Sequence, residues 1–232
     1  RYWRDWSSDV CSSDLLRCNL LPLCYMAPAE WRELRRQLRY RQLMVRQAVR
    51  MKNKAAGLLM EVGAEYSKEK LDQKGYFGQL LETVADVPES VKELLRMNRA
   101  ARDLFERAQR KLVLGLLKNP LLRERVELLR SIGGVGEILA LTWALEAGEP
   151  GRFRTMGNAI SYCGLTGAQD SSTGQDRRTP ISKQRNKHLQ AVLIEAAKVA
   201  PQWNPQLREV YDRAREVSNP NQATLEVARK LV

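Results

Sequence analysis

Two long stretches with a helical spacing of apolar residues constrain the fold of this chain more than any other feature. Apolar residues recur at intervals of three and four over about residues 28–63 and again over about residues 88–118. Asn119-Pro120 follows the second stretch and is typical of a helix end. The spacing therefore predicts two long helices, and the connector between them has room for a shorter helix at about residues 76–84.

Two helices of similar length joined by a connector favour a long antiparallel helical hairpin with coiled-coil packing, and an ordinary helical bundle is the alternative. Arginine and lysine occupy most of the remaining positions of the first helix. Most runs of charged residues on helices are simply faces exposed to solvent. A run with almost only positive charges repels itself, however, unless a polyanion neutralises it. We expect this face to contact nucleic acid, through residues that include Arg35, Arg39, Arg46 and Arg50.

The overall charge supports a polyanionic partner. The net charge is +12 and the pI is about 9.8, and 44% hydrophobic residues are enough to form a buried core. No apolar run approaches the ~20 residues of a membrane span, so we expect no membrane partner. Cys11, Cys18, Cys24 and Cys163 form no CxxC pair, and His188 is the only histidine, so zinc is not expected. A reduced, cytoplasmic protein fits best.

Glycine-rich residues lie between two expected helices, at about residues 121–130 and 137–147. Gly133, Gly134 and Gly136 give this turn a backbone that can approach a ligand closely. The N–H groups at the start of the following helix would point toward the turn, which suits a phosphate oxygen. The pattern is similar to a helix-hairpin-helix turn that grips the DNA backbone, and a plain helical corner with glycines is the alternative.

A second loop places serines beside cations. Ser171 and Ser172 lie in a hydroxyl-rich loop, where a serine is usually a turn or capping residue. Among cations, a serine oxygen could instead attack a phosphodiester, and the cations would stabilise the charge of the transition state. Asp170, Asp176 and His188 all remain candidates for the base. The residues expected to contact nucleic acid here are Arg177, Arg178, Lys183, Arg185, Asn186 and Lys187.

These residues carry a resemblance. The order SIGGVGEILALTWALEAGEPGRF, AISYCGL and SSTGQDRRTPISKQRNKHLQAVLIEAAK resembles the C-terminal transposase domain of the "one-ten" insertion-sequence family, over about residues 126–200. The resemblance implies a DNA recombinase that joins a RuvC-like DEDD domain to a serine-bearing domain and is guided by a structured RNA. By position, Ser172 would be the nucleophile, with Ser171 as the second choice. The family also implies a homo-oligomer.

The resemblance sets the expected domain organisation. Residues 1–15 resemble translated cloning adaptor sequence and are left out of the fold. We expect a basic coiled-coil region over 16–120, a transposase domain over 121–205 and C-terminal helices over 206–232 that are truncated. The DEDD domain, with the Mg²⁺ that it would bind, should precede this fragment, so no metal ligand and no cofactor is assigned here. The expected fold is all-α: the hairpin, then a small helical domain.

Three functions remain open at this point. The first is a recombinase fragment that supplies the serine half of a composite DNA-cutting site and is inactive alone. The second is a non-catalytic helix-hairpin-helix module that binds a nucleic-acid backbone. The third is a structural coiled-coil protein whose charge provides only solubility, and nucleic-acid binding that persists in high salt, or no binding at all, would favour it.

Overall fold

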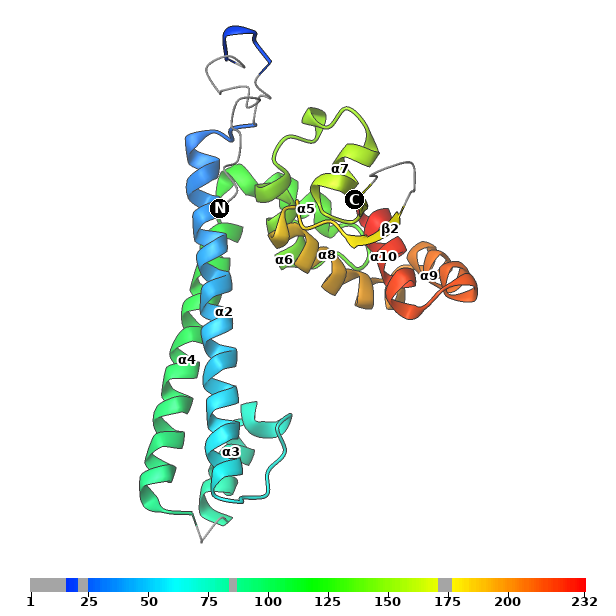
Figure 1. Cartoon of the computed structure of the whole chain (residues 1–232). Coiled ribbons are helices and arrows are strands. Elements are labelled where there is room, and N and C mark those ends of the chain that lie inside the picture. Colours follow the sequence, from blue (N-terminus) through cyan, green and yellow to red (C-terminus); the bar gives the residue numbers. More distant parts are fainter. Residues whose placement is uncertain (1–15, 21–24, 84–86, 171–176) are drawn as a thin grey trace, which may run out of the picture.

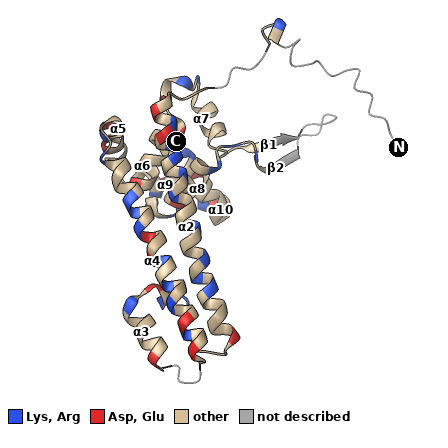
Figure 2. Cartoon of the chain, turned by 90° about the vertical axis from the view of Figure 1, so that its left-hand side faces the viewer, with Lys and Arg blue, Asp and Glu red and all other residues tan. Residues whose placement is uncertain are grey.

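The computed structural model describes residues 16–20, 25–83, 87–170 and 177–232, and the fold is all-α apart from one short β-ribbon (Figure 1). Helices α2 (Ala29–Glu61) and α4 (Glu89–Leu117) lie side by side and antiparallel, as the spacing of their apolar residues predicted. They form a long hairpin that projects from a compact helical domain. Figure 2 marks the positions of lysine and arginine in blue, and they occur along both of its helices.

The far end of the hairpin has a small core of its own. The connector folds back as η1 (Lys70–Asp72) and α3 (Lys74–Thr83), close to the helix predicted there. Leu59 of α2 and Leu95 of α4 are both 1% exposed, and the connector covers them. Asp72 accepts from Lys52 at 2.6 Å and pairs with Arg102 at 3.2 Å, so the connector is tied to both long helices. The connector therefore holds the two long helices together at the far end of the hairpin.

The compact domain follows α4 directly. Three of its helices begin at an Asn-Pro pair in which the asparagine side chain accepts a backbone N–H of the first turn, at Asn119, Asn204 and Asn219. Its elements are α5 (Pro120–Arg130), α6 (Glu137–Thr142), η2 (Trp143–Ala147), η3 (Pro150–Arg152), α7 (Met156–Tyr162), β1 (Gly167–Asp170), β2 (Arg177–Ile181), α8 (Lys187–Val199), η4 (Ala200–Gln202), α9 (Pro205–Val217) and α10 (Pro220–Leu231).

The base of the hairpin is part of the core of this domain. Leu34 and Leu38 of α2 pack in one buried cluster with Leu122 of α5 and with Leu141 and Leu145 of the helix formed by α6 and η2. Each of these leucines is 7% exposed or less. The first turns of α2 therefore cover apolar side chains of α5 and α6 and complete the buried core at this place.

Two local features differ from the sequence prediction. The helix expected over 137–147 is continuous but widens into a π-helical turn, η2, over its last five residues. Two short antiparallel strands, in which Asp170 pairs with Arg177, occur where a loop was expected. Neither strand has the alternation of apolar and polar residues that identifies a strand in sequence, and β2 contains Pro180, which sheet edges tolerate.

Candidate nucleic-acid interface

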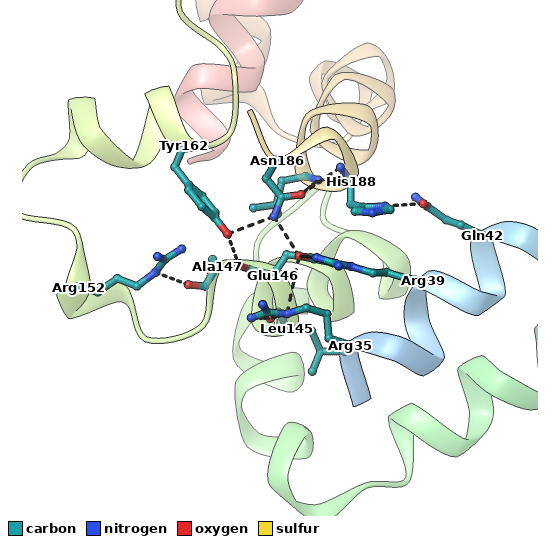
Figure 3. A network of polar contacts seen from close by, with 11 residues as sticks. Arg35, Arg39, Gln42, Leu145, Glu146, Ala147, Arg152, Tyr162, Asn186 and His188 are labelled. Carbon is teal, nitrogen blue, oxygen red and sulfur yellow. Dashed lines mark hydrogen bonds and ion pairs between the residues drawn. The ribbon is translucent and has the colours of Figure 1, made fainter. Parts of the chain in front are cut away.

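The C-terminal end of η2 is the point where the hairpin and the domain are joined. The last carbonyl groups of a helix have no partner within the helix, and cations are favourable near them because of the helix dipole. Here four successive carbonyls, which we call the carbonyl cluster, each accept from a side chain of a different element, and Figure 3 shows the first three of these contacts. Arg35 of α2 donates to Leu145 O at 2.7 and 2.9 Å, Tyr162 to Glu146 O at 3.0 Å, Arg152 to Ala147 O at 2.8 Å and Arg125 to Gly148 O at 3.1 Å.

The Glu146 side chain adds an ionic contact at the same place. Its two carboxylate oxygens accept from Arg39 Nε and Nη2 at 2.7 and 2.8 Å, and Asn186 Nδ2 donates to it at 2.9 Å (Figure 3). Burial alone would raise the pKa of Glu146, but the hydrogen bonds from Arg39 and Asn186 and the charges of Arg39 and Arg35 outweigh it, so the pKa lies below its usual value. The carboxylate is therefore charged and held from two elements.

Three side chains expected at nucleic acid thus have internal partners. Arg35 and Arg39 bind the end of η2, and Asn186 also caps α8 by accepting from the N–H groups of His188 and Leu189. Helical spacing placed both arginines on a charged face, but it could not show that this face meets the buried carboxylate of Glu146. These contacts orient α2 against the domain.

The glycine turn also has an internal explanation. Gly134 has φ +93°, and a Cβ there would lie 2.6 Å from Ala200 Cβ. A Cβ at Gly133 would lie 3.1 Å from Trp203 O, and Asn204 donates to Gly133 O at 3.3 Å. The turn packs against η4 and the start of α9 at these two positions. At Gly136, by contrast, a Cβ would meet nothing within 4 Å, so no packing contact requires a glycine there.

Other expected cations are exposed. Lys183 and Arg185 lie between β2 and α8, Lys187 begins α8, and Arg46 and Arg50 lie on α2. No ion pair joins any of these five side chains to an acidic residue among the residues that the structure describes, although Arg185 donates to Ser182 O. Their positive charge is available to a ligand.

The structure describes less of the predicted serine loop and of the two arginines that follow it. Ser171 and Ser172 lie outside the described residues. Arg177 and Arg178 lie on β2, where only the backbone is described. What the structure adds is the position of the flanking strands, since the pairing of Asp170 with Arg177 brings the two ends of the segment 171–176 together.

His188 connects α8 to the hairpin. Its Nδ1 lies 2.6 Å from Gln42 Oε1 of α2 (Figure 3). Burial lowers the pKa of His188; the charge of Glu146 opposes this, and those of Arg39, Lys187 and Arg46 reinforce it. The neutral imidazole donates from Nδ1 to the amide oxygen, which leaves Nε2 as an acceptor. A polar cavity of about 540 Å³ adjoins it, and its walls include Arg39, Tyr162, Arg185 and Lys187.

Glu146 is the main residue of the site that sequence reasoning missed. A signal for it exists, because Glu146 stands in the apolar run Ala144-Leu145-Glu146-Ala147, and a carboxylate in such a run is seldom buried without a cationic partner. The identity of that partner had no signal, because Arg39 is 107 residues away. In the described part of the chain, no group of three or more histidine, cysteine and acidic residues could hold a metal ion. No described helix is both long and apolar enough to cross a membrane.

Comparisons with known proteins agree with the resemblance noted above. Residues 126–212 match the family described as "Transposase IS116/IS110/IS902 family". The chain is 29% identical to a "Probable family 20 transposase" of Pseudomonas aeruginosa over 175 residues, which are 73% of this chain and 51% of that protein. It is 35% identical to the "Putative transposase y4qE" of Sinorhizobium fredii over 69 residues, which are 30% of this chain and 18% of that protein. The chain thus spans about half the length of the first relative.

Proposed function

We propose that this chain is the DNA-binding, serine-bearing part of an insertion-sequence transposase. The observation that supports this most is the set of three exposed cations, Lys183, Arg185 and Lys187, at the base of the β-ribbon whose connecting segment carries Ser171 and Ser172. Backbone phosphates are the ligand that such a cluster fits, because cations without acidic partners gain most from a polyanion.

The arginines of α9 differ from these three cations, because they are paired with acidic residues. Arg208 and Arg213 are also exposed, but each pairs with an acidic residue four positions away, Asp212 and Glu209 respectively. Such i,i+4 pairs are the usual use of surface arginine on a helix. The cations after β2 have no such partner in the described part of the chain, so their charge is directed outward.

In the reaction that we propose, Ser172 is the nucleophile and Ser171 the second choice. The hydroxyl oxygen forms a bond to phosphorus while the bond from phosphorus to one sugar oxygen breaks. The serine proton passes to a base, and the departing sugar oxygen takes up a proton. The product is a DNA strand joined to the protein through a phosphoserine, with no change of oxidation state. The cations nearby would stabilise the charge that develops on the phosphate oxygens.

Binding is tested by salt dependence. Replacing Lys183 and Arg185 together by alanine should weaken binding of duplex DNA, measured by fluorescence anisotropy from low to moderate salt. The slope of log K against log salt should fall by about 1.8, because each phosphate contact contributes about 0.9. The matched control replaces Arg208 and Arg213 by alanine, which removes the same formal charge and should leave the slope nearly unchanged. Equal slopes for both double variants would contradict the interface.

The nucleophile is tested by trapping. In a protein that also carries the RuvC-like domain, a nicked suicide substrate should leave DNA covalently attached to the wild-type chain. Ser172→Ala should abolish the adduct, and Ser171→Ala should retain it. If both variants still form the adduct, neither serine attacks DNA, and the chain is a non-catalytic nucleic-acid-binding module.

Three further expectations come from the resemblance alone. They are a structured guide RNA, a homo-oligomer, and Mg²⁺ in the RuvC-like domain. All three stay predictions, and co-purification of a defined RNA with the protein is the direct measurement for the first.

A further inference from the structure

A groove that shares only Lys187 with the proposed DNA contact lies between α2, α6 and α8. It has a volume of about 820 Å³, within the range of about 300–1,000 Å³ that ligand-binding pockets occupy. We call it the α2–α8 groove. Its apolar walls include Val45 of α2, Ile138 of α6, and Val192, Ala196 and Val199 of α8.

The floor of the groove is aliphatic and runs the length of α8. Leu189, Leu193 and Ala197 face the core of the domain. Val192, Ala196 and Val199 form a second apolar stripe that lines the groove, and Val199 is 47% exposed. A helix in a globular protein normally needs only one apolar face. Val192 and Ala196 also pack in part against that core, whereas Val199 is not part of it, and the groove itself follows α8 from Lys187 to Val199, which is 13 residues or about 18 Å.

The rim of the groove is positive. Arg41, Arg46 and Lys187 contribute cations for which no ion pair is recorded among the described residues. Its two carboxylates are already neutralised from outside, since Glu137 pairs with Arg130 at 3.5 Å and Glu195 with Lys198 at 3.2 Å. The Nε of Arg41 is also a buried donor without a partner. An occupant of this groove needs carboxylates at its edges.

The shape and lining of the groove favour a protein segment over a nucleic acid. Single-stranded nucleic acids bind in grooves where aromatic side chains stack on the bases, and none of the described residues that line this groove is phenylalanine, tyrosine or tryptophan. Aliphatic side chains spaced along one face are what an amphipathic helix inserts into a groove. We propose that the α2–α8 groove binds an acidic amphipathic helix of a partner protein, about three turns long, with aliphatic residues on one face and carboxylates at its edges.

The probe for this site is a synthetic stapled peptide of about three turns. Its leucines share one helical face and its remaining positions are mostly glutamate. The control peptide has the same composition in an order that scatters the leucines around the helix. The amphipathic peptide should bind the chain at least about tenfold more tightly than the control, and it should shift the methyl resonances of Val45, Val192 and Val199.

A matched pair of variants separates the groove from general charge. Arg46 and Arg50 are both exposed on α2, but only Arg46 lines the groove. Arg46→Glu should weaken peptide binding about tenfold, whereas Arg50→Glu should change it less than about twofold. The alanine variants of Lys183 and Arg185, which lie outside the groove, should retain peptide binding when DNA binding is lost, so this proposal stands or falls separately from the proposed function.

Several outcomes would overturn the proposal. Equal binding of both peptides, or no binding by either, would contradict the proposal that an amphipathic helix binds in the groove. Equal losses of peptide affinity in the two arginine variants would show that binding depends only on the net charge of the chain. If a single-stranded oligonucleotide shifted the same three valine methyls and displaced the peptide, the groove would be a nucleic-acid site instead.

Discussion

Replacing Glu146 by glutamine tests whether the contacts at the end of η2 join the hairpin to the domain. The substitution keeps the size of the side chain and removes its charge. One oxygen that accepts from Arg39 or Asn186 becomes an NH₂ group that faces another donor. The paired arginine then has no counter-charge, and a buried hydrogen bond is lost.

The expected loss follows from the geometry. Removing one partner of a buried ion pair costs about 3–5 kcal/mol, and a single hydrogen bond to a charged group contributes about 1.5–3 kcal/mol. The Arg39 side chain is 46% exposed and can return to water, and Arg35 keeps its bonds to Leu145 O. We therefore expect a loss of about 2–3 kcal/mol. For a chain of this size that corresponds to a decrease in Tm of about 4–12 °C.

The assay is thermal and urea unfolding followed by near-ultraviolet circular dichroism. Glu149→Gln is the matched control, because Glu149 is 65% exposed and pairs with Arg125 at the surface. That variant should lose less than about 1 kcal/mol. The pKa of Glu146 lies below its usual value of 4.5, so its stabilising effect should be complete above that pH and should decline as the pH falls through the folded-state pKa. If the Glu146 variant is no less stable than the Glu149 variant, the ionic contact does not hold the two parts together.

Three more predictions concern single residues. Gly134→Ala should cost about 2–4 kcal/mol in unfolding experiments, because a Cβ there is strained and collides with η4, whereas Gly136→Ala should cost less than about 1 kcal/mol; similar losses would contradict the packing of the turn. His188 has a lowered pKa, so wild-type stability should decrease as the pH falls below its usual value of 6.5, and His188→Gln should flatten that dependence; parallel pH curves would show that His188 is not responsible. Burial raises the pKa of Cys163 to about 12, so iodoacetamide should label Cys18 in the native protein and Cys163 only after unfolding, as judged by mass spectrometry.

The sequence predicted the long helices well because their signal is local and repeated. The expected spans of 28–63 and 88–118 agree with Ala29–Glu61 and Glu89–Leu117 to within two residues at each end. The β-ribbon was missed because its strands of four and five residues are too short for a period to show.

The candidate site was harder to predict, since it depends on contacts between distant residues. The sequence analysis predicted Arg35, Arg39 and Asn186 as contacts to nucleic acid. Their internal roles depend on Glu146 and on the free carbonyls at the end of η2. Gly134 was predicted to lie in a turn that contacts a phosphate backbone, and the neighbour that requires glycine there, Ala200, comes from a segment 66 positions later in the chain. No local pattern contains that information.

The carbonyl cluster has a consequence for exchanging parts between related proteins. The family match begins at residue 126, yet Leu34, Leu38 and Arg35 complete the surface that this region folds against. A chimera that takes the hairpin from one relative and residues 126–212 from another would have to transplant both sides of this junction as a set. Grafts that divide it should yield a poorly packed, protease-sensitive product even when each donor sequence is intact.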